Sequence, residues 1–198
     1  MPTRREVLWV GAGVASLSAL SSIGSRAVGA ALPVHRILTD ERFAVSRQFG
    51  AHAQRLGASV RSVHDGVHTV WEQELYPRWR ESAVAVAGLT PYAALFCLET
   101  VARDAGLQLI YRVNHRETAD GMRHEAFGSH ARLAQHTPYV DAVDGWTRQA
   151  AERVLTWPAG RQSVSASRSN IARAAERGVS AETLMTWLIA PVRVNRLA

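Results

Sequence analysis

The sequence contains no lysine, so all 23 of its basic residues are arginine. Set against 17 acidic residues, they give a net charge of +6. The absence of lysine indicates a GC-rich coding bias more than a design for binding. Because the arginines are scattered, with no run longer than two, they are typical of a solvated surface, and we expect no nucleic-acid partner.

Cysteine is almost as scarce, and a single residue, Cys97, excludes an intramolecular disulfide and a cysteine-rich metal site. Cys97 lies in the apolar stretch 94–98, which predicts a buried, inert thiol rather than a nucleophile. The chain also lacks a Gly-x-Ser-x-Gly elbow, a His-Glu-x-x-His motif and any internal repeat. We therefore expect no cofactor, and the sequence leaves open whether the protein is an enzyme.

What the chain does have is a globular composition, with 47% hydrophobic and 20% charged residues. Its 198 residues are enough for one domain with a substantial core. We divide the chain into an export signal, residues 1–31, and a single domain, residues 32–198, with a helical C-terminal extension from about residue 139.

The export signal is indicated by a basic segment, an apolar segment and a run of small residues, in that order. Residues 1–5 are basic, residues 7–24 carry no charge, and residues 27–31 are small. Arg4 and Arg5 lie in the segment Thr-Arg-Arg-Glu-Val-Leu, which resembles the motif of twin-arginine signals. The resemblance implies export of the folded protein by the twin-arginine translocase, to the periplasm or beyond. We predict cleavage near residues 29–31.

Two other interpretations of this segment stay open. One is an uncleaved membrane anchor, which needs about 20 strongly apolar residues; the 18 residues 7–24 include three glycines and four serines. The other is a dinucleotide-binding fingerprint at Gly11 and Gly13, where glycines let the backbone approach a pyrophosphate. Ser16 stands in place of the third glycine, and Asp40 comes too late to be the acidic residue of that motif.

The domain itself shows short apolar runs alternating with helical periods. This alternation predicts a three-layer α/β fold with an open, mostly parallel sheet of about four strands joined by helices. The predicted strands are Val34–Thr39, Ser59–His64, Val84–Gly88 and Leu107–Asn114. The helices between them are expected to end at Gly57, Pro77 and Gly106, and Asp40 and Thr90 are expected to cap the first and third of them.

After residue 114 the pattern changes. The turn residues 118–121 predict a hairpin, with Met122–Gly128 returning as an antiparallel edge strand whose charged residues suit exposure. The remainder is predicted to be helical, with helices at Tyr139–Trp157, Ile171–Arg177 and Ser180–Ile189. The tryptophans are expected to pack in the core.

Ligands of open parallel sheets bind beyond the carboxyl ends of the strands, so that edge is where we expect a site. Helix N-termini there favour an anion, and the predicted ligand-binding residues for a small anionic ligand are Asp40, Arg42, Asp65, Thr90 and Arg116. The candidate catalytic residues for acid–base chemistry are Asp40, His64, Asp65 and His115. A metal site would draw on His64, Asp65, His115 and His124, although their spacing matches no metal motif.

The segments Asp40-Glu41-Arg42-Phe43 and Val86-Ala87-Gly88-Leu89-Thr90 resemble uncharacterised exported bacterial proteins, and that resemblance implies no activity. Three hypotheses follow. The first is an exported ligand-binding or accessory protein, with a co-exported oxidoreductase as one candidate partner. The reason is that the export route carries folded proteins, which often acquire a partner before export. The second is a small hydrolase-like enzyme using the candidate catalytic residues, with or without a metal. The third is a dinucleotide-binding protein.

Overall fold

The computed structural model describes residues 30–118, 121–129, 133, 145–159, 166–172 and 183–192. The predicted export signal with Arg4 and Arg5, and the alternative fingerprint at Gly11 and Gly13, lie outside the described residues. The described chain starts with an antiparallel bridge between Ala31 and Pro158, where the Leu32 N–H donates to the Trp157 carbonyl at 2.7 Å. None of the described helices has the length and apolar character needed to cross a bilayer.

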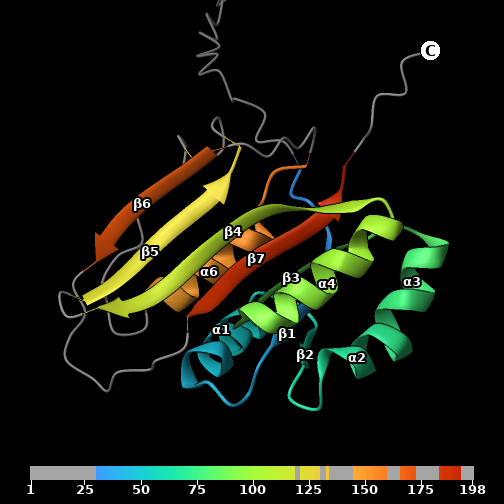
Figure 1. Ribbon diagram of the computed structural model, residues 1–198, viewed down its shortest axis with the longest axis horizontal. Coiled ribbons are helices and arrows are strands. Elements are labelled where there is room, and N and C mark those ends of the chain that lie inside the picture. The colour runs from blue at the N-terminus through green and yellow to red at the C-terminus, as the bar shows by residue number, and fades with distance from the viewer. Residues whose placement is uncertain are drawn as a thin grey trace, which may run out of the picture.

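The described elements form one mixed sheet with helices on both faces, which confirms the α/β class (Figure 1). The first half of the chain contains β1 (Val34–Thr39), α1 (Ala44–Arg55), β2 (Val60–Ser62), α2 (Val67–Val70), the π-helical turn η1 (Trp71–Leu75), α3 (Tyr76–Glu81), β3 (Ala85–Pro91) and α4 (Tyr92–Asp104). The second half contains β4 (Leu107–Thr118), β5 (Gly121–Gly128), α6 (Gly145–Leu155), β6 (Ala166–Ala172) and β7 (Leu184–Pro191).

The seven strands lie in the order β2-β1-β3-β7-β4-β5-β6. Only β1 with β2 and β1 with β3 pair in parallel, and every other pairing is antiparallel. The prediction of a mostly parallel sheet is therefore wrong. The hairpin of β4 and β5 is confirmed, but β5 is not an edge strand, because β6 pairs along its outer side.

The largest departure from the sequence-based prediction is β7, which replaces the helix expected at Ser180–Ile189. Its run Leu-Met-Thr-Trp-Leu-Ile-Ala-Pro is buried along both faces of the sheet, between β3 and β4. A short, continuous apolar run fits a central strand and a buried helix equally well, so periodicity does not separate the two. Ile171, expected in a short helix, belongs to β6. Of the predicted helical extension, the described residues retain α6.

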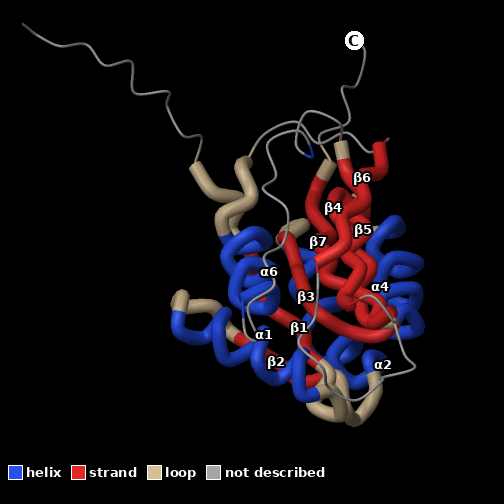
Figure 2. Tube along the Cα trace, turned by 90° about the vertical axis from the view of Figure 1, so that its left-hand side faces the viewer, coloured by secondary structure: helices blue, strands red, loops and turns tan. Residues whose placement is uncertain are grey.

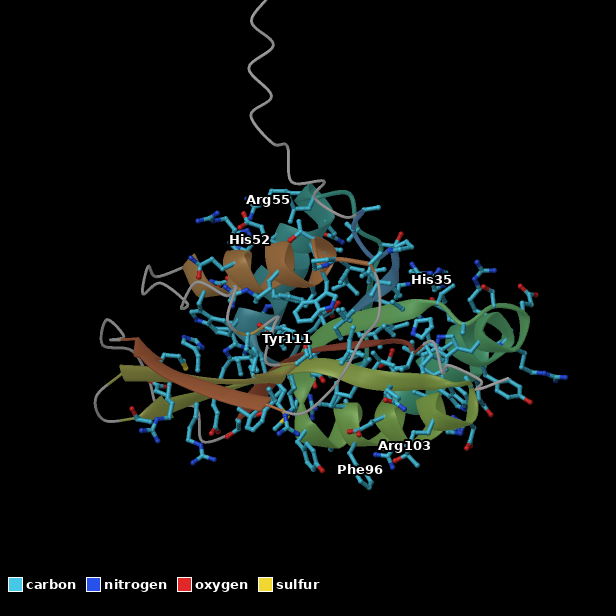
Figure 3. The ribbon with its side chains drawn as sticks, turned by 90° about the horizontal axis from the view of Figure 1, so that it is seen from above. His35, His52, Arg55, Phe96, Arg103 and Tyr111 are labelled. Carbon is cyan, nitrogen blue, oxygen red and sulfur yellow. The ribbon has the colours of Figure 1, made fainter. Side chains whose placement is uncertain are left out.

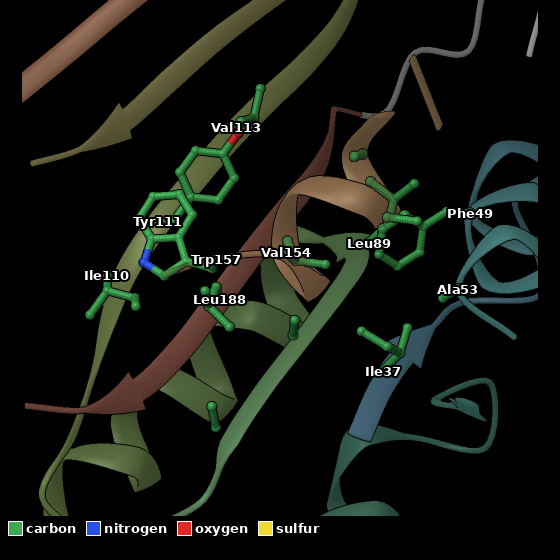
Figure 4. Close-up of a cluster of buried hydrophobic side chains, with 14 of the residues drawn as sticks. Ile37, Phe49, Ala53, Leu89, Ile110, Tyr111, Val113, Val154, Trp157 and Leu188 are labelled. Carbon is green, nitrogen blue, oxygen red and sulfur yellow. The ribbon is translucent and has the colours of Figure 1, made fainter. Parts of the chain in front are cut away.

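Two helical layers enclose the sheet (Figure 2). On one face α1 and α6 cover a core that includes Phe49, Ala150 and Val154, together with Tyr111 and Trp157, whose ring centroids lie 4.7 Å apart (Figure 4). On the other face α2, α3 and α4 cover a second core. Four of the tryptophans are buried, as expected: Trp79, Trp146, Trp157 and Trp187.

Helix boundaries follow glycine and proline, with one correction. Gly57 and Gly106 adopt φ values of 86° and 73° directly after α1 and α4, the left-handed conformation that ends a helix. Pro77, in contrast, does not end its helix. It falls in the first turn of α3, after the π-helical turn, where its missing N–H is not needed.

Gly88 in β3 makes the tightest contact with β7. A Cβ at Gly88 would lie 2.6 Å from the Leu38 carbonyl oxygen and 2.6 Å from Cζ2 of the fully buried Trp187. The backbone of β1 and the indole of Trp187 in β7 therefore occupy the space that a side chain at position 88 would need. Only glycine permits this packing of the central strand.

We predict that Gly88→Ala lowers the free energy of unfolding by about 1–3 kcal/mol, because neither the backbone oxygen nor the enclosed indole has room to move. The measurement is urea denaturation. Gly128→Ala in β5 is the matched control, since its Cβ would meet no atom closer than 3.4 Å. Equal stability of the two variants would contradict the proposed contact.

Candidate functional site

Asp40 follows β1 and lies almost fully buried, but its carboxylate is already paired. The Arg42 side chain donates from Nε to Oδ1 at 2.9 Å and from Nη2 to Oδ2 at 2.6 Å, and the Arg42 N–H donates to Oδ1 at 3.1 Å. These hydrogen bonds hold the pKa of Asp40 below its ordinary value, with a smaller contribution from the nearby His64. Asp40 is thus a saturated carboxylate.

Ser46 connects Asp40 to the sheet. Its Oγ accepts from the Asp40 N–H at 2.8 Å and donates to the Leu89 carbonyl at 2.5 Å, which links β1, α1 and β3. Asp40 does not cap α1 as predicted, because the helix begins at Ala44, after Phe43, with no side-chain cap. The Asp40 carboxylate instead fixes the turn that leads into the helix.

The other residues of the predicted edge site lie in different environments. Thr90 is not a helix cap but the sixth residue of β3, fully buried, where its Oγ1 accepts from Trp187 Nε1 at 3.0 Å and donates to the Pro91 carbonyl at 3.2 Å. His64 and Asp65 are exposed in the turn after β2. The sheet therefore does not present Thr90 to a ligand.

His115 belongs to a second cluster, on the face of the sheet covered by α6. Its Nδ1 lies 2.6 Å from Nδ1 of His124 across the β4–β5 hairpin, and its Nε2 lies 2.8 Å from Thr186 Oγ1. The Trp146 ring of α6 stacks at 4.3 Å from the His115 ring. His115, His124 and Thr186 are all buried. We call His115 and His124 the histidine pair; Thr186 is the threonine that hydrogen-bonds to it.

The short Nδ1···Nδ1 contact between His115 and His124 constrains where the protons of this hydrogen-bonded group lie. Burial lowers the pKa of His115 well below 6.5 and that of His124 to about 4, so both rings are neutral at pH 7. Two neutral rings form an Nδ1···Nδ1 hydrogen bond only if one donates and the other accepts. When His115 donates, its Nε2 accepts from Thr186; when His124 donates, His115 Nε2 donates to Thr186. The tautomer of one ring therefore fixes the tautomer of the other ring and the direction of the hydrogen bond to Thr186.

The predicted catalytic and metal-ligating residues are thus divided between two places. Asp40 follows β1 and His115 lies in β4, with β3 and β7 between them. His115 and His124 do come together, as the metal hypothesis requires, whereas His64 and Asp65 lie in the turn after β2, the strand that pairs with β1. Over the part of the chain that the structure describes, no group of three His, Cys, Asp or Glu side chains could hold a metal ion.

Arg116 belongs to a third group of residues, of which the sequence-based prediction identified only Arg116. On β4, Arg112, Asn114 and Arg116 alternate with the buried Tyr111, Val113 and His115. Their partners on β5 are Phe127, Glu125 and Arg123 in the same order. We call these six side chains the outer face of the hairpin. They share a face with Met185 and Trp187 of β7, on the α4 side of the sheet.

The outer face of the hairpin carries unmatched polar groups. Arg112 Nε and Asn114 Oδ1 are shielded from solvent and have no hydrogen-bond partner in the described structure. Arg116 and Arg123 are both exposed and lie directly opposite each other. The Arg112 guanidinium stacks 4.4 Å from the Phe127 ring centroid. This set was missed, but the period-two alternation along the correctly predicted hairpin is a signal that could have found it.

Cys97 also differs from its prediction, since it is exposed on α4 rather than buried. The apolar stretch 94–98 does not indicate burial of Cys97, because Tyr92 and Phe96 on the same helix are exposed too. Hydrophobic side chains on this helix therefore face both the core and the solvent.

The chain matches no protein-family model, no curated protein and no solved structure.

The buried histidine pair predicts acid lability. Unfolding restores the ordinary pKa of 6.5, so the unfolded state binds more protons below that pH, and stability is lost as the pH falls from 6.5 towards 4. For His124 this loss amounts to about 3 kcal/mol. We expect His124→Gln to flatten the pH dependence of urea unfolding between pH 6.5 and 4.5.

Asp40 does not interfere with this measurement, because its lowered pKa affects stability only below its ordinary value of 3.8. His68→Gln, at an exposed position on α2, is the control and should retain the native pH dependence. An unchanged pH profile in His124→Gln would show that the histidine pair does not titrate as inferred.

Proposed function

We propose that this protein is exported through the twin-arginine route and works outside the cytoplasm as an accessory protein that binds another folded protein. The observation that carries the proposal is the part of the sheet on the α4 side that none of the described helices covers. Figure 1 shows α4 lying across the middle of the sheet, while β5 and β6 extend beyond it with no labelled helix in front of them. The outer face of the hairpin lies in this part of the sheet.

Exposed aromatic side chains lie on α4, the helix on the same side of the sheet. Leu95 and Leu98 of α4 pack into the core, whereas Tyr92 and Phe96 are 50% and 56% exposed, with ring centroids 5.9 Å apart. In Figure 3 the Phe96 side chain points away from the sheet. Aromatic side chains on a surface supply much of the binding energy of protein interfaces. An exposed aromatic pair on the same side of the sheet as the unmatched polar groups supports a protein-binding surface.

Catalysis is supported less well by the same geometry. The Asp40 carboxylate is saturated by Arg42, and the histidine pair hydrogen-bonds within the core. A general base needs a proton-accepting atom within reach of a substrate. Asp40 and His115 are also separated by two strands, so they cannot act on one substrate atom. A binding role uses the groups that the fold leaves accessible.

The proposed cleavage site lies next to residues that belong to the folded domain. Ala30 and Leu32 already hydrogen-bond to Ala159 and Trp157, so the folded domain includes the chain from about the predicted cleavage site. A twin-arginine signal serves a cargo that folds before export, and a partner bound in the cytoplasm would be exported with it. A co-exported protein is therefore the partner we propose.

Replacing both signal arginines, Arg4→Lys with Arg5→Lys, is expected to retain the full-length protein in the cytoplasm. Lysine keeps the charge but removes the guanidinium groups of the twin-arginine motif. Cell fractionation and N-terminal sequencing of the native protein check this, with cleavage expected near residues 29–31. Undiminished export of the double variant would contradict the route.

Partner binding is tested by the size of the native complex in the exported fraction. Tyr92→Ala with Phe96→Ala should shift the protein from a larger species to a monomer in size-exclusion chromatography, because the aromatic contacts are lost. The matched control is Leu56→Ala, an equally exposed apolar residue at the end of α1, in the opposite helical layer. A native protein that elutes only as a monomer would overturn the accessory role.

A further inference from the structure

The charges on the outer face of the hairpin are arranged in a way that folding alone disfavours. Arg116 and Arg123 face each other across antiparallel strands, where side chains lie about 5 Å apart and like charges repel. No carboxylate pairs with either guanidinium in the described part of the chain, although the surface arginines 103 and 148 each pair with a glutamate four residues away. An external anion would remove this repulsion.

Arg112 extends the cationic surface along β4. It lies four residues from Arg116, which is about 13 Å along a strand. Its guanidinium is held against the Phe127 ring, so it is fixed in place before any partner arrives.

The span and shape of this surface select among anions. A single phosphate or sulfate reaches only one of two positions about 13 Å apart. Small ligands also favour concave sites, and this surface is one face of a two-stranded hairpin. Several anionic groups spaced along a protein segment fit it better, and arginine pairs with carboxylates through two parallel hydrogen bonds.

Glu125 makes the surface selective. It lies opposite Asn114, between the position of Arg112 and that of the Arg116–Arg123 pair. A uniformly anionic surface such as a lipid bilayer would place negative charge against Glu125 as well, which is unfavourable. A protein segment can place its carboxylates on either side of Glu125 and leave a neutral residue opposite it.

We propose that the partner docks through an acidic segment, whose carboxylates pair with Arg112 at one position and with Arg116 and Arg123 at the other. This inference rests on the proposed function, because it names the chemistry of the protein that binds beside Tyr92 and Phe96. The acidic segment lies along the outer face of the hairpin. Its carboxylates are complementary to the three arginines, and a neutral residue of the segment lies opposite Glu125.

The decisive variant is Arg123→Glu, because binding and stability should move in opposite directions. A glutamate at position 123 faces Arg116 and replaces a cross-strand repulsion with an ion pair, so the melting temperature should rise. The same change should weaken the native complex by at least about tenfold, since a carboxylate now repels the acidic segment. Arg103→Glu on α4 is the matched surface control and should leave the complex unchanged.

A direct probe is a fluorescent Asp/Glu-rich peptide, titrated with the mature protein at low and high salt. Binding should weaken as salt rises, should be lost in Arg123→Glu and should be retained in Arg103→Glu. Vesicles of phosphatidylglycerol serve as the lipid probe. Vesicle binding that depends on Arg123, in the absence of peptide binding, would overturn the proposal in favour of a membrane.

The two proposals fail differently. If Arg123→Glu and Arg116→Gln keep the native complex while Tyr92→Ala with Phe96→Ala loses it, the accessory role stands and the acidic docking is wrong. If the native protein forms no complex at all, the accessory role fails first. Arg116→Gln guards against misfolding as an explanation, because it removes a charge without adding one.

Discussion

The architecture depends on the insertion of β7 between β3 and β4. This strand comes last in the described chain, yet it lies at the centre of the sheet and pairs with both neighbours in antiparallel fashion. Trp187 makes the insertion specific, because its indole lies over Gly88 and donates its N–H to Thr90. The parallel strands on one side and the antiparallel hairpin on the other are therefore joined through β7.

This arrangement also decides which surfaces are covered. The helices α2, α3 and α4 follow the parallel strands, and they cover the α4-side core as far as β7 and β4. The hairpin of β4 and β5 continues past them. On its α6 side Trp146 covers the histidine pair, while on its α4 side the described chain supplies no helix over the outer face. The histidine pair is buried on one side of the hairpin, whereas Arg116 and Arg123 are exposed on the other.

Much of the first half of the fold could be predicted from sequence. Val34–Thr39 was predicted to the residue, and the hairpin followed from its alternation and turn residues. The sheet order could not be predicted, because nothing local distinguishes Leu184–Pro191 as a central strand from a buried helix. The site was predicted poorly for the same reason. Strand ends converge only in a fully parallel sheet, and the insertion of β7 removes Thr90 from the edge and separates His115 from Asp40.

The proposed binding role depends on how the hairpin divides its side chains between the two faces of the sheet. Side chains alternate along each strand, so His115 and Arg116, or His124 and Arg123, point to opposite faces. The histidines find partners in each other and in Thr186, and burial keeps them neutral. Arg116 and Arg123 are charged and exposed, and none of the described carboxylates pairs with them. The hairpin therefore buries its titratable histidines and exposes permanently charged arginines, and the proposed binding role depends on this arrangement.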